Sequence, residues 1–226
     1  MPEARHFWGL LRRRQCLVPT WRGWLALLLV FAALFFLLGR RAHAFLAVSA
    51  PAPGGVLVVE GWANDEALDQ AVAEVRRNHY ERVFVTGGPL EIGAPLAEYK
   101  TMAERGAAIL LKLGLGTNLV QAVPAPRVRQ DRTYASAVAL KAWMRAHGGA
   151  PSRLNLMTEG PHARRSWLLY EKAMGPKVKV GVVSIPSPEY DQEHWWRSSA
   201  GVRAVISEGL AYGYARLLFR APRDPD

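Results

Sequence analysis

The sequence predicts an α/β protein: a Rossmann-like three-layer domain with a mainly parallel sheet of about five strands, preceded by one transmembrane helix. From about residue 56 onward, short apolar runs typical of strands alternate with helical patterns. Such alternation gives a parallel sheet with helices on both faces. An uninterrupted apolar run also lies near the N-terminus. Half of the 226 residues are hydrophobic, enough for one domain with a core.

Composition divides the chain into five segments. They are a basic cytoplasmic segment (1–20), a transmembrane helix (21–40), a linker (41–55) rich in Pro, Ala and Gly toward its end, the α/β domain (56–220) and a tail (221–226). No internal repeat or low-complexity tract interrupts the α/β domain.

The N-terminal apolar run, Trp24–Leu38, predicts a single membrane span. With its flanking residues it approaches the roughly 17 residues at the short end of the spanning range. Five arginines precede the run and two, Arg40 and Arg41, follow it. The positive-inside rule then keeps the N-terminus cytoplasmic and places the α/β domain outside the cytoplasm. We therefore expect a single-pass protein of the bacterial inner (plasma) membrane.

Three alternatives to a retained anchor stay open at the level of sequence. Ala42, His43 and Ala44 form a small-x-small motif, as in the cleavage site of a secretory signal. Arg13 and Arg14 loosely resemble a twin-arginine signal. The apolar run is also compatible with a buried helix of a soluble protein.

Charge and cysteine content exclude several classes of function. The net charge is +10, but residues 1–41 hold seven Arg against one Glu, so the other 185 residues carry only +4. Nucleic-acid binding by the folded domain is therefore not favoured. The one cysteine, Cys16, excludes an intrachain disulfide, and the six His lack ligand spacing, so we predict no metal site. No nucleophile elbow, P-loop or strand-linked Gly-x-Gly-x-x-Gly is present, and the cofactor stays unknown.

The elements of the α/β domain follow in order. Predicted strands are Val56–Val59, Arg82–Thr86, Leu119–Val123, Leu154–Met157 and Val178–Ser184. Predicted helices are Asp65–Asn78, Leu96–Leu113, Thr133–His147, His162–Met174 and Trp195–Phe219.

The last predicted helix carries apolar residues at helical spacing, which favours one face packed on the sheet. These residues are Val202, Val205, Ile206, Gly209, Leu210, Gly213 and Leu217. A membrane-apposed role for Trp195 and Trp196, together with Tyr212, Tyr214 and Phe219, remains an alternative.

Polar residues and glycines follow four of the predicted strands. Because the carboxyl ends of parallel strands share one edge, these residues are expected to line one ligand site. The candidate ligand-binding residues are Glu60, Gly61, Trp62, Thr86, Gly87, Gly88, Arg132, Thr133, Thr158 and Arg165.

The strand-to-helix corner from Thr158 to Arg165 carries several side chains that can take part in acid–base chemistry or bind an anion. His162 falls in the first turn after Pro161, where the positive helix end disfavours imidazolium, so the ring can act as a base. Arg165, one turn further, can bind a phosphate or carboxylate through two hydrogen bonds. Glu159 and Asp131 are acids that could orient the imidazole. We therefore take His162, Glu159 and Asp131 as candidate catalytic residues. The expected ligand is anionic.

Each assignment has a structural alternative. His162 could merely cap its corner, with Arg165 paired to Glu159, and Asp131 could serve as the N-cap of the third helix. Thr86-Gly-Gly could be a simple turn at the end of a strand. Arg127 and Arg129 are expected to lie in a solvated loop.

Four segments together resemble the YdcF/SanA/ElyC family of bacterial envelope proteins. They are Val56-Leu-Val-Val-Glu-Gly-Trp62, Val83-Phe-Val-Thr-Gly-Gly88, Arg132-Thr-Tyr134 and Thr158-x-x-x-His162-x-x-Arg165. The resemblance implies a Rossmann-like domain on the outer side of the inner membrane and a link to peptidoglycan or lipid-carrier metabolism. It also implies an acid near Glu208, and one cytoplasmic relative is associated with S-adenosylmethionine. This chain departs from many relatives at Glu60, Glu159 and Ala135.

Together these observations predict a membrane-anchored protein of envelope biogenesis or integrity that binds an anionic, phosphorylated or nucleotide-like ligand, free or lipid-linked. If it is an enzyme, it would be a hydrolase or transferase acting on a phosphorylated envelope precursor. The alternative is a non-catalytic ligand-binding or assembly module. The sequence does not set the oligomeric state.

Overall fold

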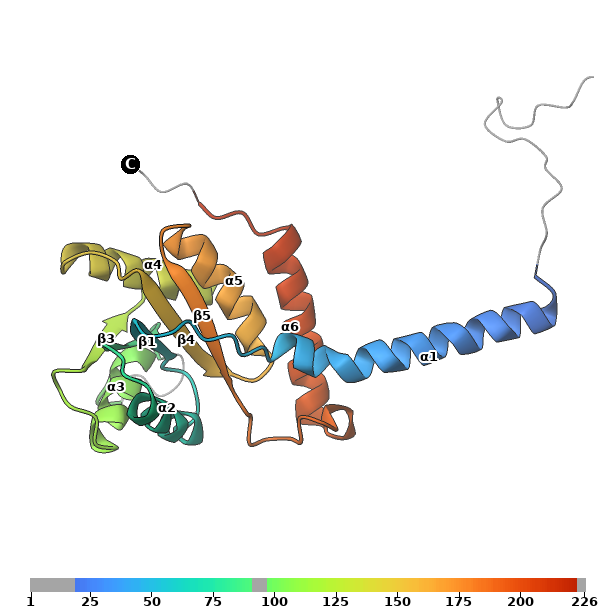
Figure 1. Cartoon of the computed structure of the whole chain (residues 1–226), viewed down its shortest axis with the longest axis horizontal. Helices are drawn as coiled ribbons and strands as arrows, with labels where there is room; N and C mark the ends of the chain where they lie inside the picture. Colours follow the sequence, from blue (N-terminus) through green and yellow to red (C-terminus); the bar gives the residue numbers. More distant parts are fainter. Residues whose placement is uncertain (1–18, 91–96, 223–226) are drawn as a thin grey trace, which may run out of the picture. The chain divides into compact units, whose positions relative to one another are not determined.

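The computed structural model describes residues 19–90 and 97–222 (Figure 1). Almost all of the basic segment predicted for residues 1–20, with Cys16 and the Arg13–Arg14 pair, lies outside the described residues. So does most of the predicted tail.

The α/β domain is built on one five-stranded, all-parallel sheet in the order β3-β2-β1-β4-β5. The strands are β1 (Val56–Glu60), β2 (Val83–Gly87), β3 (Val120–Pro124), β4 (Arg153–Glu159) and β5 (Lys179–Ile185). Each begins and ends within two residues of its predicted bounds. The predicted α/β class, with its parallel sheet, is confirmed.

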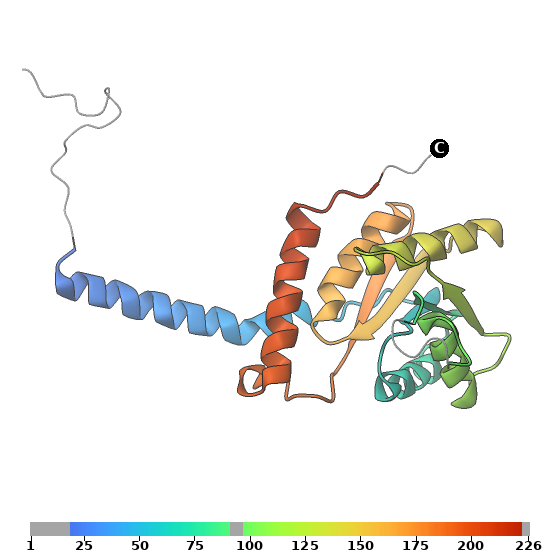
Figure 2. The same ribbon diagram turned by 180° about the vertical axis from the view of Figure 1, so that it is seen from behind.

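Helices cover both faces of the sheet (Figures 1 and 2). Helices α2 (Asp65–Arg77) and α3 (Met102–Lys112) pack on one face, and α4 (Arg132–Ala146) and α5 (His162–Met174) pack on the other. After a short 3-10 helix, η1 (Trp195–Arg197), helix α6 (Ser199–Leu217) packs against α5.

The central strands show why the domain has two cores. Leu57 and Val59 of β1 join the cluster under α2 and α3, whereas Val56 and Val58 join the cluster under α4 and α5. Side chains alternate between the faces of a strand, so a strand covered on both sides must be apolar throughout. Every residue of β1 is buried, including Glu60 at its end.

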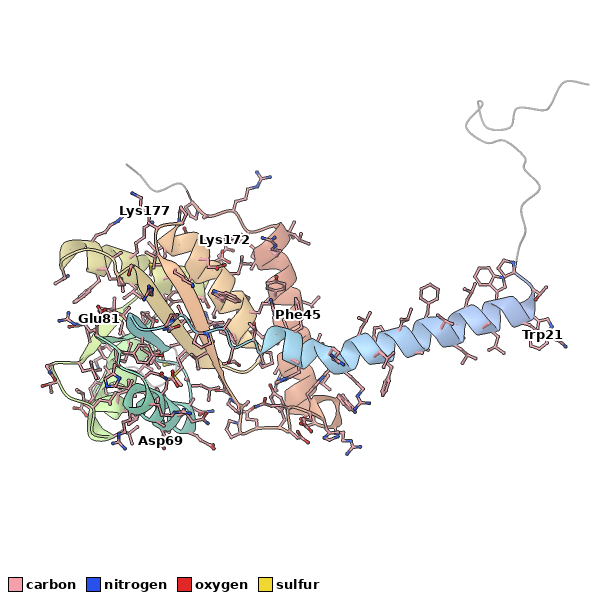
Figure 3. The ribbon with its side chains drawn as sticks, viewed as in Figure 1. Trp21, Phe45, Asp69, Glu81, Lys172 and Lys177 are labelled. Atoms are coloured by element: carbon pink, nitrogen blue, oxygen red, sulfur yellow. The ribbon has the colours of Figure 1, made fainter. Side chains whose placement is uncertain are left out.

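Helix α1 (Trp21–Leu46) is long and apolar enough to cross a membrane, and in composition it also fits a signal sequence. Its apolar side chains are largely exposed along the predicted span, for example Phe35 at 81 %. Figure 3 draws the side chains along this helix, with Trp21 labelled near its start. The chain divides into two compact units between Gly39 and Arg40.

The last turns of α1 belong to the α/β unit. His43 and Leu46 are buried there, and the His43 ring nitrogen Nε2 lies 3.3 Å from the Tyr190 hydroxyl. Phe45 makes an edge-to-face ring contact with Tyr212 of α6. Residues 41–46, which we assigned to a linker, are therefore helical and packed, because they carry apolar side chains that fit against α6.

Two other helices begin later than predicted. Helix α3 starts at Met102 rather than Leu96, which lies outside the described residues; Thr101 and Glu104 form a reciprocal capping box that fixes this start. The final helix is interrupted at Ser198, whose side chain accepts a hydrogen bond from the Gly201 amide and so begins α6.

Candidate functional site

A cavity of about 720 Å³ opens at the carboxyl edge of the sheet. The strand order reverses between β1 and β4, and in open α/β sheets such a switch point is where ligands bind. Ten predicted residues line the cavity: Glu60, Trp62, Thr86, Gly87, Gly88, Asp131, Arg132, Thr133, His162 and Arg165. The structure thus brings together residues from four separate strand ends.

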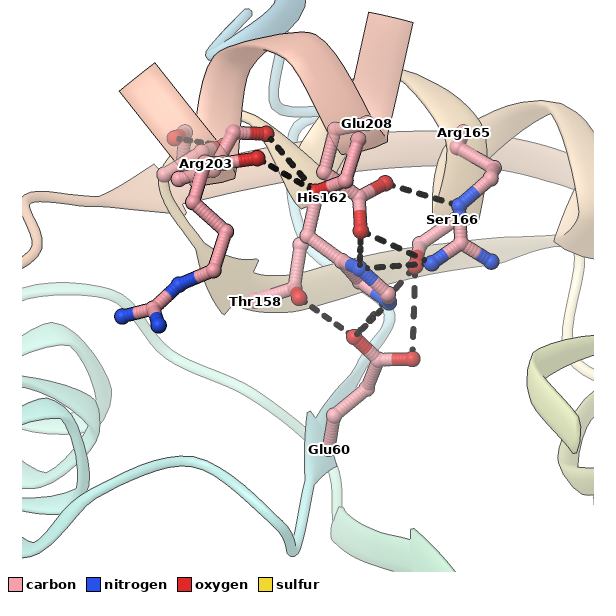
Figure 4. A network of polar contacts seen from close by, with 11 residues as sticks. Glu60, Thr158, His162, Arg165, Ser166, Arg203 and Glu208 are labelled. Carbon is pink, nitrogen blue, oxygen red and sulfur yellow. Dashed lines mark hydrogen bonds and ion pairs between the residues drawn. The ribbon is translucent and has the colours of Figure 1, made fainter. Parts of the chain in front are cut away.

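Glu60, the last residue of β1, is a buried carboxylate, 2 % exposed (Figure 4). It accepts a hydrogen bond from the Thr158 hydroxyl at the end of the neighbouring strand β4. The Ser166 hydroxyl of α5 lies 3.3 Å from both carboxylate oxygens. These hydroxyls partly replace the water that Glu60 loses on burial. Thr158 therefore acts on the site through Glu60, without lining the cavity itself.

His162, at the start of α5, lies between two carboxylates. Its Nδ1 is 2.9 Å from Glu208 Oε1, and its Nε2 is 3.5 Å from Glu60 Oε2 (Figure 4). Trp62 adds an edge-to-face ring contact at 4.8 Å between ring centroids. The imidazole is therefore held from several sides.

Arg165, one turn along α5, binds Glu208 of α6 through two nitrogens. Its Nε is 2.7 Å from Oε2 and its Nη2 is 3.0 Å from Oε1. Burial by itself raises the pKa of Glu208, but the hydrogen bonds and charges of His162 and Arg165 outweigh it and lower the pKa to about 2. Glu208 therefore carries a negative charge at neutral pH and ties α5 to α6.

Two side chains contact the His162 Nδ1 atom at the same distance. Glu208 Oε1, which only accepts hydrogen bonds, and Arg165 Nη2, which only donates them, each lie 2.9 Å away. Nδ1 can therefore donate to Glu208 or accept from Arg165, depending on which ring nitrogen carries the proton. The His162 Nε2 faces Glu60 without a hydrogen-bond partner in the part of the chain that the structure describes. An orienting acid on one ring nitrogen and a free second nitrogen is the arrangement of a general acid or base.

The opposite wall of the cavity is the loop before α4. Arg127, Arg129 and Arg132 lie on this lining with Asp131. All three arginines are exposed, and no ion pair of Arg127 or Arg129 with another described residue is present. Three guanidiniums against one carboxylate make this wall positive, which suits an anionic ligand.

Asp131 has a backbone that few residues adopt, with φ 56° and ψ 37°. Among the described non-glycine residues it alone has positive φ, a conformation costing about 1 kcal/mol. It occupies the N-cap position of α4, yet its side chain makes no capping hydrogen bond. The N-cap alternative thus holds for its position but not for its carboxylate.

The caps of the helices differ in a way that relates to the cavity. Asn64, Thr101 and Ser198 cap α2, α3 and α6 with side-chain hydrogen bonds. Helices α4 and α5 begin at the cavity without any such bond. The positive end of each helix therefore lies at the cavity and favours an anion there, although the Ala163 amide of α5 already donates to the Gly160 carbonyl.

Three other predicted residues, Thr86, Gly61 and Gly87, contribute to packing within the domain. The Thr86 hydroxyl lies 2.9 Å from the buried Tyr170 hydroxyl. A Cβ on Gly61 would overlap the Met102 carbonyl, and one on Gly87 would lie 2.7 Å from the Met102 Cβ. These glycines let α3 approach the sheet, and Gly61 is not part of the cavity lining.

Glu159, which we predicted to be catalytic, lies away from the cavity. Its Oε2 accepts a hydrogen bond of 3.1 Å from Asn64, the N-cap residue of α2. Successive residues of a strand point to opposite faces, so when Thr158 contacts Glu60, Glu159 turns toward α2. The alternative in which Arg165 pairs with Glu159 does not hold either, because Arg165 pairs with Glu208.

Sequence reasoning underestimated three contributors: Glu208, Ser166 and the pair Arg127 and Arg129. Glu208 was not among the predicted site residues, although it is the only acid in helix α6. That isolation, with the acid that the family resemblance implies nearby, was the available signal. Ser166 gave no signal, since serine in a helix is unremarkable by sequence.

No group of three or more His, Cys, Asp or Glu side chains that could hold a metal ion is found among residues 19–90 and 97–222. The chain was compared with family models, characterised proteins and solved structures, and none of them matches it.

Proposed function

We propose that this chain is a bacterial inner-membrane protein, held by α1, whose extracytoplasmic α/β domain binds an anionic, phosphorylated ligand during envelope biogenesis. The observation that carries the ligand class is the make-up of one cavity. Three arginines and two uncapped helix starts line it together with a histidine held by carboxylates. The resemblance to the YdcF/SanA/ElyC family supports the envelope role.

A retained anchor is supported by the end of α1. The Ala42-His43-Ala44 motif lies inside the helix, and the His43 side chain is 4 % exposed within the α/β unit. Arg40 also stacks on the Trp196 ring at 5.4 Å. Cleavage after Ala44 would remove these packed groups from the domain, so retention preserves the fold.

The ligand would be oriented by the two walls together. Arg127, Arg129 and the positive ends of helices α4 and α5 would hold its phosphate. The His162 imidazole would then exchange a proton at Nε2 with the bound ligand, while Glu208 and Arg165 hold the ring in place through Nδ1. This supports a hydrolase or transferase acting on a phosphorylated envelope precursor.

A second candidate function is a non-catalytic ligand-binding or assembly module. It is favoured by one observation: the His162 Nε2 atom has almost no accessible surface. A ligand would have to displace neighbouring side chains to reach it. In this case the cluster would serve only to hold α5 and α6 together.

Two measurements on the full chain separate these functions. Untargeted mass spectrometry of co-purifying small molecules should find a phosphorylated compound that is depleted in an Arg127→Ala/Arg129→Ala variant. Complementation of a deletion strain with His162→Gln then tests catalysis. Loss of complementation with the co-purifying compound retained supports the enzyme, whereas full complementation excludes it. Recovery of no anionic compound from wild-type protein would contradict both.

The anchoring is tested by fusing a reporter that is active only outside the cytoplasm to the C-terminus. We expect activity, and a protein that stays with membranes after an alkaline wash at its full mass. A shortened chain beginning near residue 45 in the soluble fraction would overturn retention.

A further inference from the structure

Helix α6 carries apolar side chains on both of its faces. One face packs inward: Val205 and Ala215 are buried, and Glu208 on that side reaches into the cluster at His162. The other face exposes Ile206, Leu210, Tyr214, Leu217 and Leu218. We had expected Ile206, Leu210 and Leu217 to pack on the sheet, and this was wrong, because a helix apolar all round has no spacing that selects the inner face.

This exposed surface, residues 206, 210, 214, 217 and 218, is contiguous. The residues recur three or four positions apart, so they lie on one side of the helix. Leu210 is 73 % exposed and Leu217 is 81 % exposed. Isolated exposed leucines are ordinary, but a continuous apolar row on one helix marks an interaction surface.

Positive charge flanks the apolar row. Arg203 lies before it, and Arg216 and Arg220 lie at its end, all of them exposed. The only acid of the helix, Glu208, is turned inward and paired with Arg165. An exposed apolar row bordered by arginines fits a surface of anionic headgroups over acyl chains.

The position of α6 in the chain favours a membrane over a second copy. Leu46, at the end of α1, packs with Val205 and Trp195, and Phe45 contacts Tyr212. Helix α6 is thus fixed to residues that follow the predicted span by only a few positions. A symmetric pairing of two α6 rows would also bring like-charged arginines together, which is unfavourable.

We infer that the exposed face of α6 docks on the anionic lipid surface of the membrane that holds α1. The inference rests on the anchoring proposed above. Tyr214 belongs both to this face and to the lining of the cavity. Docking therefore brings the cavity mouth to the level of the lipid headgroups, so that a ligand carried by a lipid need not leave the bilayer.

The test places an environment-sensitive label on α6 in the full chain. In a Cys16→Ser background, Leu210→Cys is labelled with a nitrobenzoxadiazole dye. Leu111→Cys on α3, also an exposed leucine, is the matched control. The proteins are reconstituted into phosphatidylethanolamine and phosphatidylglycerol vesicles containing lipids spin-labelled near the headgroup.

We expect spin-labelled lipid to lower the fluorescence at position 210 about twofold and to leave position 111 unchanged. Replacing phosphatidylglycerol by phosphatidylcholine should weaken the effect, since the arginines lose their anionic partners. A Leu217→Glu change in the labelled protein should abolish it, with an unchanged circular dichroism spectrum.

Two results would overturn the inference. One is an unquenched label at position 210 in protein that floats with the vesicles after an alkaline wash. The other is efficient disulfide formation between two copies at that position, which would assign the face to a dimer. Protein that does not float with vesicles would instead contradict the anchoring itself.

Discussion

The two walls of the cavity are built in opposite ways. On the α5 and α6 wall, charged groups are buried and paired: Glu208 holds both His162 and Arg165, and hydroxyls hold Glu60. On the wall before α4, Arg127 and Arg129 are exposed, and Asp131 has a strained backbone. On the first wall the charged groups pair with one another, whereas Arg127 and Arg129 on the second wall have no ion-pair partner among the described residues.

This difference separates two physical tasks. A paired, buried cluster contributes to folding and fixes the geometry of its imidazole, as reactive groups require. Exposed arginines without an ion pair, such as Arg127 and Arg129, contribute little to folding but gain on binding an anion. Changes on the first wall should therefore alter stability most, and changes on the second should alter ligand binding.

The largest effect should follow Glu208→Ala. It leaves Arg165 without its bidentate partner and His162 without its orienting acid in a largely buried setting, which typically costs about 3 to 5 kcal/mol. We expect a marked fall in the unfolding free energy, measured by urea denaturation in detergent with tryptophan fluorescence. Glu81→Ala, at an exposed loop position, is the matched control and should change it by less than about 0.5 kcal/mol.

An unchanged midpoint in Glu208→Ala would show that the cluster does not stabilise the fold. A double variant with Arg165→Leu sharpens the test, since it also removes the charge left unpaired. It should be more stable than Glu208→Ala alone.

Acid should reproduce part of that loss. The pKa of Glu208 is about 2 in the folded protein and near its ordinary value of 4.5 when unfolded, so the unfolded chain binds more protons between these values. Its contribution, about 3 kcal/mol, is present above pH 4.5 and is lost as the pH falls toward 2. The difference in unfolding free energy between wild type and Glu208→Ala should therefore narrow over that range. A difference independent of pH would contradict the ionised pair.

The walls also differ in how far the sequence predicted them. The fold, the edge of the sheet and the place of Glu60 and His162 follow from periodicity and from the rule that strands end together. The partner of Arg165 does not follow from these rules. Glu208 lies 43 positions away on another helix, and tertiary packing decides which side of that helix points to the site. Glu159 shows the same limit: one residue of strand register decides which face a side chain takes.

On the open wall, Arg127→Ala with Arg129→Ala should leave stability within about 0.5 kcal/mol of wild type, since both side chains are exposed. The same variant should bind inorganic pyrophosphate about tenfold more weakly, because two charge-assisted hydrogen bonds are lost. Isothermal titration calorimetry measures this. Arg82→Ala with Lys179→Ala, which removes two exposed positive charges at the amino ends of β2 and β5, is the matched control. Equal loss in both variants would show that only net charge matters.

The smallest effect should come from Asp131→Gly, which we expect to raise the unfolding free energy rather than lower it. Glycine adopts positive φ without the Cβ clash, so the backbone of Asp131 predicts a gain of up to about 1 kcal/mol in unfolding free energy. Since the aspartate makes no capping hydrogen bond, no cap is lost to offset that gain. Asp131→Ala keeps the clash and should not stabilise. If Asp131→Gly stabilises the fold but weakens pyrophosphate binding, the strained backbone is maintained for the ligand. If the variant binds pyrophosphate as tightly as wild type, the Asp131 carboxylate has no part in binding this probe.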